Sequence, residues 1–410
     1  MRRSVLPTVV GALTSMLCAR SASATDCSGI LSPCINDDTL WPHPGPATFE
    51  FVGSTDTVAA RQLGFGLVST YLFRPVTLHL PSPGGAGSDQ YAISDQADGT
   101  FLWAYGVTDR LELDLALPVT FGQGGTGLTP LTGGPGLKDT AVRDFRYGFA
   151  FRWLGVPGHD GWAGVARFEV SAPSGDRSQF AGESAAVLVP SLAIDGRAGR
   201  WFAGAEVGVR ARPPTQLLQA RVGSQLSASL GVGYRILPQD RLSIEAEAWA
   251  LPSLVAQATL AADSPYASQA GGGSLVPAEW QVSARTAPIG AGDVSFQLGG
   301  GGRIPLGDSG LTSPGFRLVL AIRWAPLGRE RPAQVAGAET RAEGTPPVPL
   351  PLEAGNDACV EEPDPVDGFD TERGCPDADQ DKDGIDDRFD RCPLVPEDFA
   401  GLTDGCPEKK

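Results

Sequence analysis

The sequence predicts an all-β protein: an antiparallel transmembrane β-barrel of about twelve strands, followed by a small, extended calcium-binding module stapled by disulfides. Three observations lead to this prediction. Apolar and polar residues alternate along many segments, and tight turns alternate with long loops. The negative charge is also concentrated at the C-terminal end. The first two observations concern residues 61–328, and the third concerns residues 357–410.

The alternation has a period of two. In RLELDLALPV, the side chains of Leu111, Leu113 and Leu115 fall on one face, and those of Glu112 and Asp114 fall on the other. This period is typical of strands, because successive strand side chains point to opposite faces. The same pattern recurs in RLSIEAEAW (241–249), DVSFQLG (293–299) and GFRLVLAIRW (315–324).

Alternation alone also fits a soluble β-sandwich, but strand length and loop pattern favour a membrane barrel. Many predicted strands reach ten residues, which is the length that a tilted strand needs to cross a bilayer. Short turns on one side and long loops on the other are typical of outer-membrane barrels, and six long loops with five short turns place both barrel ends in the periplasm. The long loops lie near 82–91, 123–139, 174–183, 213–220, 252–276 and 305–314, and the short turns near 108, 155–161, 196, 239 and 290.

The N-terminus has the features of an export signal. Arg2 and Arg3 precede an apolar run that is too short to span a bilayer, and ASA at 22–24 is a small-residue cleavage site. We therefore expect cleavage after Ala24 and a Gram-negative outer-membrane location, with the C-terminal tail in the periplasm. The expected organisation is a signal peptide (1–24), an N-terminal periplasmic segment (25–60), the barrel (61–328), a Pro/Ala-rich linker (329–356) and the calcium-binding module (357–410).

Cleavage would remove Cys18 and leave six cysteines. An even number of cysteines in an exported chain implies disulfides, although the sequence does not fix their connectivity. Proximity along the chain suggests three pairs: Cys27–Cys34, Cys359–Cys375 and Cys392–Cys406.

The stretch DADQDKDGIDDRFDRC, residues 377–392, has the spacing of a calcium loop. Calcium prefers six to eight oxygen ligands, and alternate aspartates around a glycine turn bring carboxylates to one point. The glycine is Gly384. The module also carries most of the charge, with a net −12 against −16 for the whole chain. The expected ligands are Asp379, Asp381, Asp383, the carbonyl of Ile385, Asp387 and Asp390, with Asp377 and Asp386 as spare oxygens for a second ion.

The segment from Asp379 to Cys392 resembles a thrombospondin type 3 repeat. The wider order of signal peptide, barrel, Pro-rich linker and such repeats resembles a group of OmpA-family outer-membrane proteins, and AYGVTDRLELDLALPV (104–119) resembles a barrel turn of that group. The resemblance implies calcium as the bound ion, and a periplasmic protein or cell-wall partner for the tail. The peptidoglycan-binding domain of that group does not follow the repeats in this sequence, so its anchoring role is not carried over.

The remaining patterns limit the function. The acidic balance excludes nucleic-acid binding through a basic patch. The inward acids Glu112, Glu169, Glu245 and Glu247 are interpreted as lumen residues balanced by Arg167, Arg210, Arg317 and Arg323, and no enzyme activity is expected. The main hypothesis is a structural, envelope-organising barrel in outer-membrane lipid with a calcium-bound periplasmic stalk. The alternatives are a porin-like channel or small-molecule uptake barrel, and a secreted calcium-binding adhesion protein.

Overall fold

A computed structural model of the chain describes residues 27–80, 88–156, 160–237, 242–258, 275–287, 294–306 and 311–326. The predicted signal peptide, linker and calcium-binding module lie outside the described residues, as do Cys359, Cys375, Cys392 and Cys406. No helix within the described ranges is long and apolar enough to cross a membrane.

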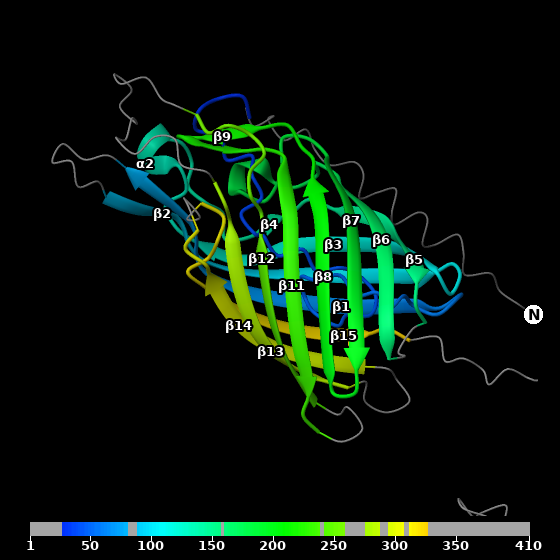
Figure 1. The fold of residues 1–410 in the computed structure, drawn as a ribbon. Coiled ribbons are helices and arrows are strands. Elements are labelled where there is room, and N and C mark those ends of the chain that lie inside the picture. The colour runs from blue at the N-terminus through cyan, green and yellow to red at the C-terminus, as the bar shows by residue number, and fades with distance from the viewer. Residues whose placement is uncertain are drawn as a thin grey trace, which may run out of the picture. The chain divides into compact units, whose positions relative to one another are not determined.

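Twelve strands form one closed antiparallel barrel (Figure 1). The ring closes where β1 (Leu63–Leu80) pairs with β15 (Phe316–Trp324), with Phe65 opposite Trp324. The predicted all-β barrel is therefore confirmed, and a two-sheet sandwich is excluded. The other barrel strands are β2 (Ser88–Gly106), β3 (Leu111–Gly124), β5 (Arg146–Leu154), β6 (Gly161–Ser171), β7 (Val187–Ala198), β8 (Trp201–Arg210), β11 (Gln225–Arg235), β12 (Leu242–Ala250), β13 (Ala278–Thr286) and β14 (Val294–Arg303).

Smaller elements decorate one end of the barrel. The short strand β4 (Ala141–Val142) pairs with β3, and β9 (Thr215–Leu217) forms a hairpin with β10 (Ala220–Val222). The helix α2 (Thr129–Thr132) lies in the same β3–β5 connection as β4 (Figure 1), and the 3-10 turn η1 (Arg177–Gln179) lies in the β6–β7 connection. We call it the long-loop end, because the strand ends that lead into the six longer connections predicted from the sequence lie there. The five shorter connections meet at the opposite, short-turn end.

Each strand buries one face and exposes the other, but the polarity is the reverse of a soluble protein. In β15 the inward side chains include Arg317 and Arg323, whereas Leu318, Leu320 and Ile322 point outward. Burial of charge and exposure of large apolar side chains are unfavourable in water. The arrangement suits a barrel whose outer face contacts lipid.

Aromatic side chains gather toward both ends of the outer face. At the short-turn end, Phe65 stacks on Trp324 with ring centroids 5.6 Å apart, and Trp201 lies 4.8 Å from Tyr234. At the long-loop end, Phe73 lies opposite Phe316 in the β1–β15 register. Two aromatic belts flanking an apolar band are typical of barrels in an outer membrane, where the rings sit at the lipid–water interfaces.

The outer face allows a depth-dependent test. Leu230 lies in the middle of β11 and is 67 % exposed, whereas Leu237 lies just beyond the short-turn end of the same strand. In lipid, Leu230→Arg should destabilise the barrel by about 2–4 kcal/mol, and Leu237→Arg by only about 0–1 kcal/mol. Urea unfolding in lipid vesicles, followed by heat-modifiable migration on gels, measures the difference. Equal, small effects would mean that this face does not lie in lipid.

Candidate functional site

The N-terminal segment occupies the barrel lumen. Its polar groups contact inward-facing side chains on β2, β3, β5, β6, β8, β12, β13 and β15. These strands are distributed around the whole barrel, and one segment can contact the inward side chains of all of them only from inside the barrel. In Figure 1 the blue N-terminal trace is seen inside the ring of strands. We call residues 31–60 the plug segment. The sequence led us to expect this stretch in the periplasm, and the structure corrects that expectation.

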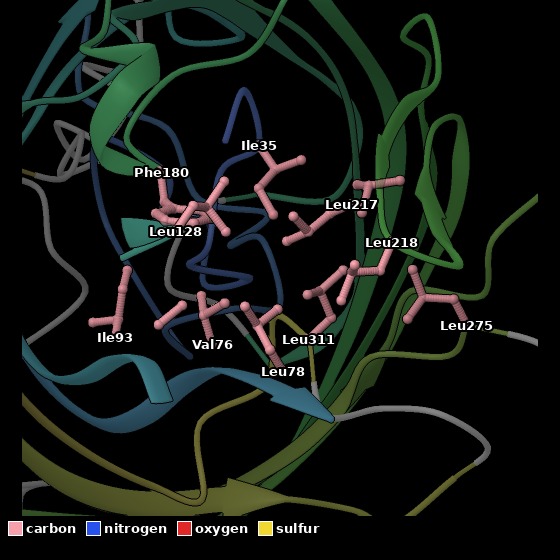
Figure 2. Close-up of a cluster of buried hydrophobic side chains, with 12 residues drawn as sticks. Ile35, Val76, Leu78, Ile93, Leu128, Phe180, Leu217, Leu218, Leu275 and Leu311 are labelled. Carbon is pink, nitrogen blue, oxygen red and sulfur yellow. The ribbon is translucent and has the colours of Figure 1, made fainter. Parts of the chain in front are cut away.

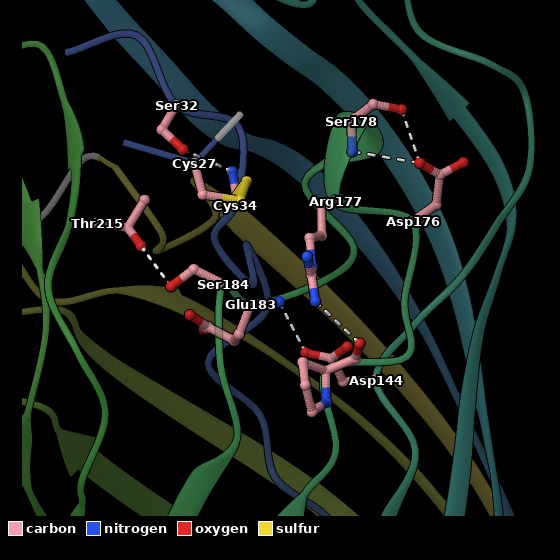
Figure 3. The surroundings of a disulfide bond; sticks show 11 residues. Cys27, Ser32, Cys34, Asp144, Asp176, Arg177, Ser178, Glu183, Ser184 and Thr215 are labelled. Atoms are coloured by element: carbon pink, nitrogen blue, oxygen red, sulfur yellow. Dashed lines mark hydrogen bonds between the residues drawn. A yellow bond between two sulfur atoms is a disulfide. The ribbon is translucent and has the colours of Figure 1, made fainter. Parts of the chain in front are cut away.

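The plug segment enters at the long-loop end. Leu31 bridges Leu217 of the β9–β10 hairpin, and Asn36 bridges Ala181 of the loop after β6. Cys27 and Cys34, which flank Leu31, form a disulfide (Figure 3) that closes a small loop at the mouth of the barrel. The loop cannot straighten while the bond is intact, so this end of the plug segment is held in a compact form.

The loop between β4 and β5 is tied to its neighbours by a buried carboxylate. Asp144 accepts hydrogen bonds from the backbone amides of Gly175 and Glu183, each 2.7 Å long (Figure 3 shows the bond from Glu183). Burial raises the pKa of the Asp144 carboxyl to about 6, although the two amides oppose the shift. The contact joins two loops that surround the plug entrance.

An apolar cluster covers the long-loop end (Figure 2). Ile35 of the plug segment packs there among side chains from the strand tips and loops, which converge from separate parts of the ring. Such burial stabilises the loops by about 25 cal/mol for each Å² of apolar surface removed from water. The cluster comprises Ile35, Val76, Leu78, Ala92, Ile93, Leu128, Phe180, Leu217, Leu218, Val222, Leu275 and Leu311.

Below the cluster, two aspartates of the plug segment pair with arginines. Asp37 lies 2.5 Å from Arg143, whose other terminal nitrogen lies 3.0 Å from Asp98 of β2. Asp38 lies 2.8 Å from Arg317 of β15, which also binds Glu279 of β13 at 2.9 Å. Arg317 is fully buried, and a buried guanidinium without such partners would be strongly destabilising.

Glu50 of the plug segment pairs with two arginines of the wall. Its two carboxylate oxygens accept from Arg323 of β15 at 2.9 Å and from Arg285 of β13 at 3.2 Å. Nearby, Glu247 of β12 accepts backbone hydrogen bonds of 2.9, 2.8 and 3.2 Å from Glu50, Phe51 and Val52. The wall thus binds this part of the plug segment through both a side chain and three successive amides.

His43 links the plug segment to the opposite side of the ring. Its Nδ1 lies 2.5 Å from Glu169 of β6, and its Nε2 lies 3.5 Å from Glu206 of β8. Trp41 donates its indole N–H to the same Glu169 at 2.7 Å, and the guanidinium of Arg146 lies 4.3 Å from its ring centroid. These contacts combine charge pairing with a cation–π interaction.

Aromatic side chains of the plug segment also pack against the wall. Phe51 stacks on Trp249 of β12 with ring centroids 4.7 Å apart. Phe49 packs directly over Gly231 of β11, where a Cβ atom would lie 2.8 Å from the ring. The inward glycine in LGVGY therefore makes room for a plug side chain, because any larger residue would collide with it.

The plug segment leaves at the short-turn end and leads directly into β1. The amide of Val58 donates to Glu112 of β3, and the amide of Ala59 donates 3.0 Å to the carbonyl of Pro326, beyond β15. At Gly106 the chain passes so close that a Cβ atom would lie 2.2 Å from the carbonyl oxygen of Ala59. The segment therefore traverses the whole lumen, from one end to the other.

The four acids and four arginines that the sequence assigned to the lumen do point inward. However, most of these acids do not form ion pairs with the four arginines expected to neutralise them. Glu112, Glu169 and Glu247 bind the plug segment. Two of the four acids also pair with a wall arginine: Glu245 lies 3.2 Å from Arg285, and Glu169 lies 4.0 Å from Arg146. All four arginines contact the plug segment. Arg167 donates to the carbonyl of Ser54, Arg210 to that of Thr39 and Arg323 to that of His43. Arg317 pairs with Asp38.

No family model matches this chain, and no curated protein matches it. Among solved structures, an outer membrane channel from Pseudomonas putida F1 is similar at 16 % identity, with 66 % of this chain and 98 % of that chain covered and a TM-score of 0.46. A FadL homologue of Pseudomonas aeruginosa is similar at 11 % identity, with 70 % and 99 % covered and a TM-score of 0.38. The P. putida toluene transporter TodX is similar at 9 % identity, with 66 % and 92 % covered and a TM-score of 0.36. With TM-scores below 0.5, these likenesses give no residue-level correspondence to this chain.

The Glu50 contact provides a test of the plug segment. Glu50→Gln removes the charge that Arg285 and Arg323 share, and should destabilise the plug by about 3–5 kcal/mol, because the buried Arg323 guanidinium loses its carboxylate partner and Arg285 keeps only Glu245. The control is Lys138→Ala, which removes an exposed ion pair with Asp176 and should cost about 0–1 kcal/mol. Urea unfolding in detergent, read by limited proteolysis within residues 31–60, compares the two. Equal sensitivity of the two variants would show that the Glu50 contacts do not hold the segment.

Proposed function

We propose that this protein is an outer-membrane channel or uptake barrel whose lumen is closed at rest by its own N-terminal segment. The observation that carries the proposal is the combination of an apolar outer face with a charged inner wall bound to residues 31–60. A barrel that served only as a membrane anchor could fill its lumen with apolar side chains. Here nearly every strand presents polar groups inward, which suits passage of water and solutes once the segment moves.

The kind of contact between plug segment and wall supports a movable closure. Ion pairs such as Glu50–Arg323 and Asp38–Arg317 can exchange for contacts with water or a solute, whereas a packed apolar core opens only with a large loss of burial. The segment is also attached covalently at its C-terminal side, where it continues into β1. A shift toward the long-loop end would therefore open the lumen without releasing the segment. Transport rather than catalysis is the activity that this arrangement favours.

The direction of insertion follows from the loop pattern. In outer-membrane barrels the short turns face the periplasm and the long loops face outward. The short-turn end carries Leu63 and Trp324, so residues after the barrel would emerge in the periplasm. The Cys27–Cys34 loop would then lie at the cell surface, at the outer mouth of the lumen.

The proposal predicts a conductance that depends on the plug segment. In a planar bilayer, Glu50→Gln should raise the frequency or size of single-channel steps relative to the wild type, because the segment is held less firmly. Lys138→Ala should match the wild type. If all three proteins are inserted but silent, the channel proposal fails, and a structural role is favoured.

We further propose that residues 357–410 form a calcium-bound periplasmic stalk, as the type 3 repeat and OmpA-family resemblance implies. The support is the aspartate spacing from Asp379 to Asp390 around Gly384, which without a cation would place like charges together. The partner of such a stalk would be a periplasmic protein or the cell wall.

The calcium proposal is tested by titrating the full-length protein with Ca²⁺ in a calorimeter. An extracellular-type site predicts a Kd of about 10⁻⁴–10⁻³ M. Asp383→Asn should abolish or strongly weaken the binding, because it removes a ligand beside the turn glycine. Asp404→Asn, outside the predicted loop, serves as the control. Heat release that is unchanged by Asp383→Asn would contradict the assigned ligands.

A further inference from the structure

A small enclosed cavity lies between the plug segment and the wall, in the half of the lumen nearer the long-loop end. Its volume is about 10 Å³, which is the space of a single water-sized species. Asn36, Thr39 and Trp41 of the plug segment line one side, and the long-loop ends of β6, β7, β8 and β11 line the other. The cavity is therefore complete only while the plug segment is in place.

Arg210 of β8 lines this cavity and lacks a counter-ion. The residue is only 5 % exposed, its Nη2 donates 2.9 Å to the carbonyl of Thr39, and its guanidinium lies 4.9 Å from the ring centroid of Trp41. Among the described residues, no carboxylate forms an ion pair with it. A buried guanidinium without a carboxylate is strongly destabilising unless another anion takes that place.

The two acids that line the same cavity do not neutralise Arg210. Glu183 pairs with Arg212, and Asp38 lies 2.8 Å from Arg317. Each acid thus already has an arginine of its own. These four residues form two neutral pairs, so the charge of Arg210 remains as an excess of one positive charge at the cavity.

Two hydroxyl groups add further donors to the lining. Ser171 at the end of β6 and Thr312 in the loop before β15 both line the cavity, and neither hydroxyl has a hydrogen-bond partner within the described ranges. A hydroxyl can donate to an anion, and hydrogen bonds to charged groups are stronger than those between neutral groups. With the guanidinium, the hydroxyls surround a water-sized space with groups that favour negative charge.

We propose that this cavity binds one small anion, with chloride as the abundant ion of suitable size, as the counter-ion of Arg210. Water fits the volume but brings no charge, and a carboxylate or phosphate solute is too large for it. Because the plug segment and the wall each supply part of the lining, the anion binds only when the segment is seated. By mass action it stabilises that form. The site goes beyond the channel proposal, since it involves the seating of the segment and not conduction.

The test is limited proteolysis within residues 31–60 of the full-length protein in detergent, while sodium gluconate is replaced by sodium chloride. Constant ionic strength keeps the screening of other charges unchanged, and gluconate is too large for the cavity. In the wild type, cleavage should slow and then level off as chloride rises. Arg210→Met should abolish this dependence. Thr312→Val removes one hydroxyl at similar shape, and should raise the chloride concentration for half the effect about tenfold.

The matched control is Thr70→Val, because Thr70 is also a buried threonine but lies on β1 and does not line the cavity. Its chloride dependence should equal that of the wild type. A wild-type cleavage rate that is the same in both salts would show that the cavity holds only water, and would overturn the site. Chloride dependence retained in Arg210→Met would overturn it too. If Arg210→Met does not fold, equal half-effect concentrations in Thr312→Val and Thr70→Val overturn the site, and a tenfold difference supports it.

Discussion

The structure depends on one constraint: charged side chains that point into the barrel must find partners there. The apolar outer face forces the polar half of each alternating strand inward. Inside a ring of this size, the charges on one wall reach only part of the opposite wall. The N-terminal segment supplies what is missing, with acids for the arginines of β13 and β15 and amides for the acids of β3, β8 and β12. The wall and the plug segment are therefore each incomplete without the other.

This dependence explains the composition of the plug segment. It carries charged residues where the wall has opposite charge, as at Asp38 and Glu50, and aromatic residues where the wall has glycine or tryptophan, as at Phe49 and Phe51. Prolines occur at positions 42, 44 and 46, where the segment passes Arg146 of β5 and Glu169 of β6.

The strands of the barrel could be predicted from the sequence, whereas the plug segment inside the barrel could not. The alternation of apolar and polar residues in stretches such as RLELDLALPV predicts that the stretch is a strand and which of its side chains point inward. It therefore also predicts which acids face the lumen, because a strand has only two faces. The loop pattern gave the number of strands and the end at which the barrel begins and finishes. The plug segment shows no regular alternation of apolar and polar residues, because it is held by single contacts to many strands and not by the hydrogen-bond ladder of a sheet. Its contacts join residues far apart in sequence, such as Glu50 and Arg323, which no local pattern reveals.

A signal for the plug was nevertheless present. Glu112 and Glu247 have no opposite charge at neighbouring inward positions of their own strands, and about thirty-six residues (25–60) lie between the predicted cleavage site and the predicted barrel. Charges that the wall cannot neutralise, together with a segment rich in acids and aromatics before the barrel, indicate a filled lumen. The two observations are informative only in combination.

The most direct test of the account is amide hydrogen exchange of the intact protein in detergent, followed by mass spectrometry of peptides covering residues 47–58. The amides of Glu50, Phe51, Val52, Gly53 and Val58 are bonded to wall carboxylates. We therefore predict protection in these peptides comparable to that of the strands β12 and β15, and its loss in Glu50→Gln. Exchange in the wild type at the rate of an unstructured peptide would show that the segment does not fill the lumen, and would contradict the account.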